Sequence, residues 1–138
     1  MSVATADRRR IDLSRKTALL AAGDLAAILA FIVLGSFSHP YGPFDVGHIA
    51  GAFAPFLVGW LLVAGPAGLY ASDAPGTLVN STLVTVLAWV VAVAIAQALR
   101  ATSLFPGGAA LTFAVVSVLV GGLLLTLWRV GATLTVGR

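Results

Sequence analysis

Four apolar stretches, each about twenty residues long, occupy most of this chain of 138 residues. They cover residues 17–36, 49–70, 77–99 and 109–128. A helix rises about 1.5 Å per residue, so a helix of this length spans the roughly 30 Å hydrocarbon core of a bilayer. The pattern predicts an all-α integral membrane protein whose four helices cross the bilayer.

The composition excludes a soluble fold. Hydrophobic residues make up 59% of the chain and charged residues 9%, with a mean hydropathy of +1.04. A soluble domain typically has about a quarter of its residues charged. The segments outside the stretches are too short to bury a core of their own. We expect a basic cytoplasmic segment at 1–16, one membrane bundle at 17–130 and a short cytoplasmic tail at 131–138.

Basic residues are concentrated on one side of the predicted spans. Five of the eight lie before the first span, namely Arg8, Arg9, Arg10, Arg15 and Lys16. With the N-terminus inside, Arg129 and Arg138 are also cytoplasmic, and Arg100 alone is external. Because cytoplasmic flanks are enriched in Lys and Arg, we expect a multi-pass protein of the cell membrane with both termini in the cytoplasm. The charge suits anionic headgroups of the lipid bilayer. Nucleic-acid binding is excluded, since no aromatic and basic surface accompanies the charge.

The connections between the predicted spans are short and contain Pro and Gly, which break helices. They cover residues 37–48, 71–76 and 100–108. Short connections make consecutive helices antiparallel neighbours. An up-down-up-down four-helix bundle, N-in and C-in, is therefore predicted.

Small residues recur on one face of every span. They are Ala22, Ala26 and Ala30 in the first span, Gly47, Gly51, Pro55 and Gly59 in the second, Thr77, Ser81, Thr85, Ala88, Ala92 and Ala96 in the third, and Ala114, Ser117 and Gly121 in the fourth. Helices in lipid associate through close packing of such residues. Packing within the bundle explains these faces, but four helices need only some of them internally. We therefore expect a homo-oligomer or a membrane protein partner.

Asp24 is the first candidate functional residue, because it lies about two turns inside the first span. An ionised carboxylate there costs several kcal/mol unless it is paired or protonated. In antiparallel order, Arg129 at the inner end of the fourth span is a possible partner, and Asn80 with its neighbours on the third span is a neutral alternative. One interpretation is a proton or cation site; the other is an ion pair or hydrogen bond that holds the bundle together.

A second candidate site lies on the external side, where His39, Asp45 and His48 surround the first connection and Arg100 ends the third span. Two imidazoles and a carboxylate indicate a metal site or a pH-sensitive gate. However, nine residues separate the two histidines, which is not a helical ligand spacing, and no third strong ligand completes the set. We therefore expect no metal and no cofactor, and a structural role in which Arg100 fixes the loop through Asp45.

A third group, Pro55, Phe56, Gly59 and Trp60, lies in the middle of the second span. Proline removes a backbone hydrogen bond and should bend the helix. The ring N–H of Trp60 needs an acceptor at this depth. A central pocket beside a kink is one interpretation, and ordinary helix packing is the other.

The segments Gly23-Asp24, Ser38-His39 and Ala54-Pro55-Phe56-Leu57-Val58-Gly59-Trp60 resemble an uncharacterised family of small four-span membrane proteins, the domain-of-unknown-function family 3054. The resemblance covers nearly the whole chain, and the last segment is its most specific part. It implies a fold and a membrane location but no reaction. It directs attention to Asp24, His39, Pro55 and Trp60 as a set.

Catalytic patterns are missing from the sequence: it has no nucleophile elbow, phosphate-binding loop, zinc-protease helix or paired membrane aspartates. Without cysteine, thiolate catalysis and disulfides are excluded. We expect a non-enzymatic membrane interaction or assembly subunit. The alternative is a small oligomeric permeation module for ions, protons or small solutes that uses Asp24. An enzyme or cofactor protein using His39 and His48 has the least support.

Overall fold

The computed structural model describes residues 14–37, 45–70, 77–104 and 110–135, and their regular structure is helical, which confirms the all-α fold. Three apolar segments form single helices, and the fourth is divided by a π-helix. The elements are α2 (Arg15–Ser36), α3 (Val46–Ala64), α4 (Leu78–Arg100), α5 (Leu111–Val116), the π-helix η1 (Ser117–Gly121) and α6 (Gly122–Thr135). Four helical segments are long and apolar enough to cross a membrane, so this is a multi-pass membrane protein.

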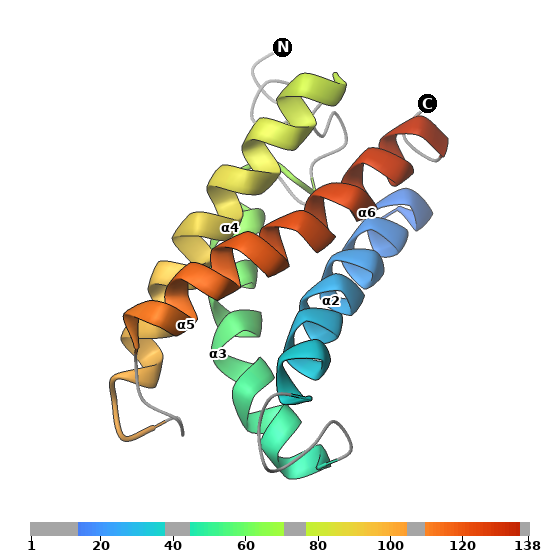
Figure 1. Cartoon of the computed structure of the whole chain (residues 1–138). Helices are drawn as coiled ribbons and strands as arrows, with labels where there is room; N and C mark the ends of the chain where they lie inside the picture. The colour runs from blue at the N-terminus through green and yellow to red at the C-terminus, as the bar shows by residue number, and fades with distance from the viewer. Residues whose placement is uncertain (1–13, 38–44, 71–76, 105–109, 136–138) are drawn as a thin grey trace.

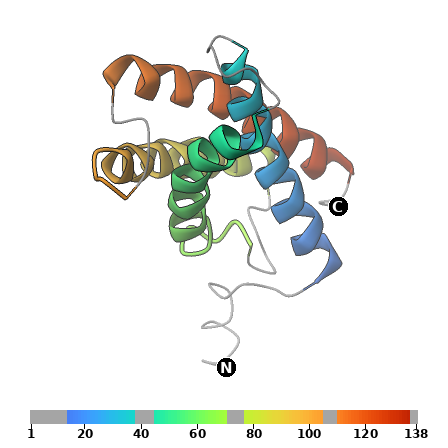
Figure 2. The same ribbon diagram turned by 90° about the horizontal axis from the view of Figure 1, so that it is seen from below.

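The helices form a ring in which each packs against its neighbours in the chain (Figures 1 and 2). α2 packs against α3 and α6, and α4 packs against α3 and the fourth helical segment. Figure 1 shows the start of α2 and the end of α6 at the same end of the molecule. Residues from all four segments therefore meet inside the ring.

Side-chain caps start three of the four helical segments. Ser14 Oγ accepts a hydrogen bond from the Thr17 amide at 3.3 Å, and Thr77 Oγ1 accepts one from the Asn80 amide at 3.1 Å. Asp45 Oδ1 accepts one from the His48 amide at 3.0 Å. Such caps pair backbone donors that the first helical turn leaves unpaired. They fix the points at which the chain enters the bundle.

The second segment ends differently from the prediction, because helix α3 ends at Ala64 and residues 65–70 form turns. The Leu69 amide donates to the Ala64 carbonyl at 3.1 Å, and the Gly68 amide donates to the Gly65 carbonyl at 3.0 Å. This pair of bonds is a Schellman motif, in which the residue at Gly68 takes a positive φ, here 85°. The motif turns Leu69 and Tyr70 back toward the bundle, where both are buried.

Five aromatic side chains fill the middle of the ring and are called the aromatic core below: Phe31, Phe56, Trp60, Trp89 and Phe113. The rings of Phe31 and Phe56 meet edge to face with centroids 5.4 Å apart. Phe56 and Trp89 stack at 5.7 Å, and Trp60 lies 6.2 Å from Trp89. All four helical segments contribute to this contact set, so it fixes their relative positions.

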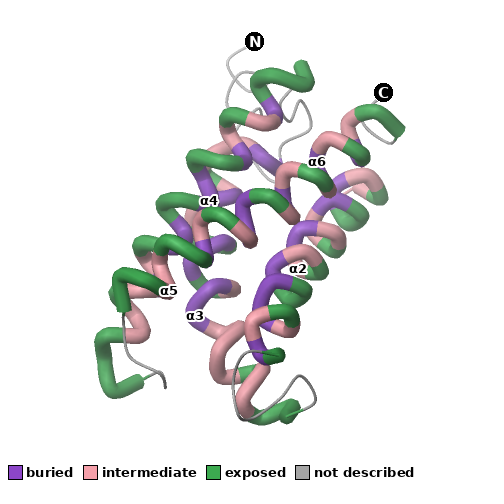
Figure 3. Tube along the Cα trace, in the orientation of Figure 1, coloured by how far each residue is buried: buried purple, intermediate pink, exposed green. Residues whose placement is uncertain are grey.

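Buried residues follow the inner sides of the helices and exposed residues follow the outer sides (Figure 3). The exposed positions include many leucines and valines, such as Leu61, Leu83 and Leu123. In water such a surface would be unfavourable, whereas lipid tails cover it without cost. The outer surface therefore fits a bilayer.

Close backbone approach joins α3 to α4. A Cβ built on Gly59 would lie 2.5 Å from the carbonyl oxygen of Ala92, so a larger residue does not fit there. Ala88, Ala92 and Ala96 are all buried along the same face of α4. The small faces predicted on the second and third spans thus meet at Gly59 and Ala92, whereas Gly47 and Thr77 at the starts of these faces are exposed.

Candidate functional site

The site begins with an ion pair between α2 and α6. Asp24 is 0% exposed and Arg129 is 2% exposed. Arg129 Nε donates to Asp24 Oδ1 at 2.8 Å, and Arg129 Nη2 donates to Asp24 Oδ2 at 2.5 Å. This is the bidentate arrangement in which a guanidinium binds a carboxylate most strongly. The pair joins the first helix to the last.

Two further side chains extend this pair into a chain of hydrogen bonds. The Tyr70 hydroxyl donates to Asp24 Oδ2 at 2.5 Å, and Trp60 Nε1 donates to the Tyr70 hydroxyl at 2.8 Å. Arg129 Nη1 donates to the carbonyl of Leu69 at 3.3 Å. We call Asp24, Arg129, Tyr70 and Trp60 the polar cluster. It joins α2, α3, the turn after α3, and α6.

The electrostatics keep Tyr70 in the form that the cluster needs. Burial raises the pKa of the Tyr70 hydroxyl, and the negative charge of Asp24 raises it further. The hydroxyl therefore stays protonated and can donate its hydrogen bond to the carboxylate. The Arg129 guanidinium also lies 5.4 Å from the centroid of the Tyr70 ring, which adds a cation–π contact.

The residues just before Asp24 and Arg129 position the pair. Trp128 packs its indole directly on Gly23, where even a Cβ would collide with the ring. Trp128 Nε1 also donates to the carbonyl of Leu20 at 3.3 Å. Gly23 and Trp128 bring α2 and α6 into contact one residue before the ion pair. Asp24 and Arg129 therefore lie opposite each other.

The chemistry of the cluster is that of a closed, paired network. Both carboxylate oxygens of Asp24 accept hydrogen bonds, and the charge of Asp24 is balanced by Arg129. A charge at this depth is costly unless it is paired and hydrogen-bonded, and both conditions hold here. Removing one partner would leave the other buried and charged. The network is therefore suited to holding four chain segments together.

The structure unites some predicted site residues and separates others. Arg129 is the partner of Asp24, as the sequence suggested. Asn80 lies at the exposed start of α4, where its backbone amide bonds to the Thr77 side chain. The acceptor that Trp60 needs is the Tyr70 hydroxyl. Sequence reasoning missed Tyr70, although a tyrosine near the inner end of a span was a signal.

The external candidates take different places in the structure. Asp45 caps α3 by accepting from the His48 amide, and Arg100 lies over the ring of Phe113, 4.6 Å from its centroid. His39 lies outside the described residues. The proposed loop-fixing role of this set, and its metal-free state, remain predictions.

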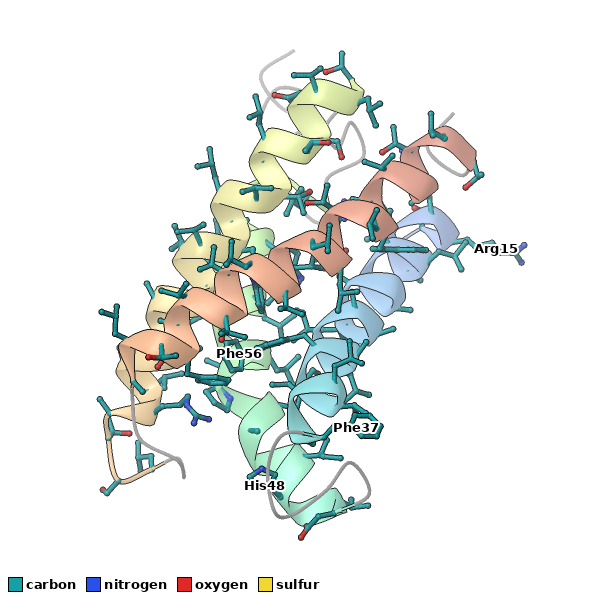
Figure 4. All side chains as sticks on the ribbon, in the orientation of Figure 1. Arg15, Phe37, His48 and Phe56 are labelled. Atoms are coloured by element: carbon teal, nitrogen blue, oxygen red, sulfur yellow. The ribbon has the colours of Figure 1, made fainter. Side chains whose placement is uncertain are left out.

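The third group is divided between two packing roles. Pro55 and Phe56 are buried, and Figure 4 shows Phe56 pointing between the helices while Arg15 projects away from the bundle. Gly59 lies against Ala92, and Trp60 joins the polar cluster to the aromatic core. These contacts agree with the packing interpretation of the group.

The chain matches the model of a protein family. Residues 21–132 match the model of a family described as a protein of unknown function, DUF3054, which confirms the resemblance found in the sequence. The matched region contains all four members of the polar cluster. Searches of curated proteins and of solved structures found no match.

Proposed function

This chain belongs to the DUF3054 family of proteins of unknown function, and we propose that it is a non-enzymatic membrane assembly subunit that associates with a second copy of itself through the outer face of α2. The proposal rests on one observation. Of the four faces of small residues along the spans, the one on α2 is left exposed by the bundle. Its residues are Ala22, Ala26 and Ala30, with Ala18 one turn earlier.

The other outer faces carry mainly larger side chains, although Ala94 and Ala98 are also exposed on α4. Exposed positions on α4 include Leu83, Leu87 and Val91, and those on the fourth segment include Leu119 and Leu127. Large branched side chains on a lipid-facing surface keep a neighbouring helix backbone at a distance. Alanines spaced four residues apart instead allow two helix backbones to approach, which is how membrane helices associate.

A two-fold axis beside α2 would place this face against its own copy. Such an interface is self-complementary, because the same residues face each other from both chains. The alanine face runs for about three turns, and Leu19 and Leu29 beside it are exposed and available to close the edges of the contact. This geometry favours a second copy as the partner.

The polar cluster supports a non-enzymatic role. Asp24 and Arg129 are the buried charged residues in the described part of the chain, and each is paired with the other. A catalytic acid, base or nucleophile has to reach a substrate. In this arrangement the carboxylate oxygens are instead directed at Arg129 and Tyr70.

The orientation belongs to the same proposal. Arg15 and Lys16 start α2, and Arg129 lies near the end of α6, at the same end of the bundle. Arg100 ends α4 on the opposite side. This distribution supports cytoplasmic termini. Reagents that label only the outer surface of intact cells should reach a cysteine at Leu104 and spare one at Thr135.

Cross-linking tests the assembly. The chain contains no cysteine, so single cysteines can be introduced without further changes. A cysteine at Ala22 should form a covalent dimer under oxidation in native membranes. A cysteine at Ala94, on the exposed face of α4, is the matched control and should stay monomeric. Equal dimer yields from the two positions would contradict an interface on α2.

A second candidate, a permeation module, is favoured by the presence of a carboxylate inside a span. It predicts proton or ion flux through proteoliposomes that disappears in Asp24→Asn. Flux that survives this change, or folded protein that shows no flux, would contradict the permeation role and favour the assembly role.

A further inference from the structure

The π-helix η1, between α5 and α6, is the least regular part of the spans. Hydrogen bonds in a π turn join residues five apart instead of four, so the turn holds one residue more than an α-helix of the same length. In η1, the Ser117 carbonyl accepts a hydrogen bond from Trp89 Nε1 at 2.8 Å. The Ser117 hydroxyl donates to the Phe113 carbonyl at 2.6 Å. A side chain of α4 therefore takes part in the hydrogen bonding of this turn.

The bundle holds the helix more firmly on the α6 side of η1 than on the α5 side. On the α6 side, Arg129 is paired with Asp24, Trp128 is bonded to Leu20, and Leu125 is fully buried. On the α5 side, none of the six described residues is buried. Phe113 is the residue by which α5 reaches the aromatic core, with ring centroids 6.1 Å from Phe31 and 5.8 Å from Phe56. If the helix changes register, α5 is the part that moves.

We propose that η1 is a conformational switch with two registers, and that Trp89 selects the π register seen here. In the second register the segment is α-helical throughout, and α5 turns by about 100°, the angle of one residue in an α-helix. Ala114 then takes the place of Phe113 in the aromatic core. The ion pair of Asp24 and Arg129 is unchanged.

Two contacts of Trp89 stabilise the π register. Its indole N–H pairs with the Ser117 carbonyl, and its ring lies so close to Gly121 that a Cβ there would collide with it. Register changes of this kind occur on the microsecond to millisecond timescale. The change also moves Phe113 away from the guanidinium of Arg100, so it alters the surface at the end of the bundle opposite the polar cluster. It is independent of the outer face of α2.

A deletion and an insertion at the same position test whether η1 holds one surplus residue, that is, one more than an α-helix of the same length. Leu119 is 66% exposed and makes a suitable position in η1. Deletion of Leu119 should give a continuous α-helix with α5 and α6 docked as they are now. In ¹⁵N-tryptophan spectra, the indole signal of Trp89 should move, and those of Trp60 and Trp128 should stay. Insertion of one alanine after Leu119 adds a second surplus residue, so it should displace Phe113 from the aromatic core and move the signal of Trp60, the neighbour of Trp89, as well. Equal loss of native signals in both variants would overturn the proposal.

A second pair of variants tests the selection by Trp89. Val115 is 50% exposed, and in the all-α register it takes the partly buried place of Ala114. In micelles, Trp89→Phe should therefore slow maleimide labelling of a Val115→Cys reporter several-fold. Adding the deletion of Leu119 to Trp89→Phe should restore the original rate, because the shorter helix docks without the π turn. Leu87→Phe, at an exposed position of the same helix, is the control and should leave the rate unchanged. An unchanged rate in Trp89→Phe, or a slow rate that the deletion does not restore, would show that Trp89 does not select the register.

Discussion

The small faces of α2 and α4 have the same sequence pattern and opposite surroundings. On α4, Ser81, Thr85, Ala88, Ala92 and Ala96 are buried inside the bundle. On α2, Ala18, Ala22, Ala26 and Ala30 are exposed. The difference arises because α2 turns its polar and aromatic residues inward, including Asp24 and Phe31, and these leave the alanines outside. A periodic pattern of small residues thus identifies a packing face but does not identify its partner.

The buried small face where α3 packs on α4 should be more sensitive to substitution than the exposed face of α2. Gly59→Leu would force a side chain into the backbone of α4 at Ala92, where no flexible group can move away. We expect loss of the folded bundle, measured as thermal unfolding in detergent. Gly131→Leu is the matched control, because among the described residues no atom lies within 4 Å of a Cβ built there. Similar melting temperatures for the two variants would contradict the close packing of α3 on α4.

The polar cluster holds the side of α2 that carries Asp24 toward the inside of the bundle. Arg129→Met should disrupt this cluster. The change leaves Asp24 buried and without its counter-charge, at a cost of about 3–5 kcal/mol. Chemical unfolding in mixed micelles would measure the loss. Adding Asp24→Asn should recover part of it, because the buried charge is then removed. A double variant less stable than Arg129→Met would contradict this account of the pair.

The turn that carries Tyr70 into the cluster depends on Gly68. Its φ of 85° lies in the left-handed region. A Cβ in this region costs about 1–2 kcal/mol. Gly68→Ala should therefore lower the unfolding free energy by this amount and weaken the hydrogen bond between Trp60 and Tyr70. The indole signal of Trp60 would report the second effect, and no change in either measurement would argue against the turn.

Tyr70→Phe should lower the unfolding free energy by about 1–3 kcal/mol, because Trp60 loses its acceptor. The variant also has a pH signature. Since burial and Asp24 raise the pKa of Tyr70 in the folded protein, its contribution is complete below the unfolded value of 10.0 and is lost as the pH rises above it. Wild type should lose stability above pH 10 more steeply than Tyr70→Phe. Parallel curves would contradict the placement of the hydroxyl beside the carboxylate.

The sequence predicts the parts of this structure that depend on local pattern. The length of the apolar stretches gives the helices, and the expected order of the spans points to Arg129 as the partner of Asp24, which the structure shows bonded to it. The position of Tyr70 depends on the positive φ at Gly68, and a glycine near a helix end is too common to indicate such a turn by itself. In the π-helix, the Ser117 carbonyl accepts a hydrogen bond from Trp89, which is 28 residues away in the sequence. Contacts of this kind cannot be read from a single segment.

Substitutions on the exposed face of α2 should weaken the association of two chains and leave the folding of the single chain unchanged. Ala26→Leu adds a side chain on the outer side, where lipid accommodates it, so the stability of the single chain should change least of all these variants. Ala94→Leu makes the same change on the outer face of α4. Equal unfolding curves for both variants are expected, and a large loss in Ala26→Leu would mean that the α2 face is not free.

The most direct test of the account is energy transfer between labelled copies of the protein in lipid bilayers, measured over a range of protein-to-lipid ratios. We predict a saturable dimer signal for wild type and for Ala94→Leu, and a signal reduced to that of random encounters for Ala26→Leu. A signal at the level of random encounters in wild type, or a dimer signal unaffected by Ala26→Leu, would contradict assembly through α2.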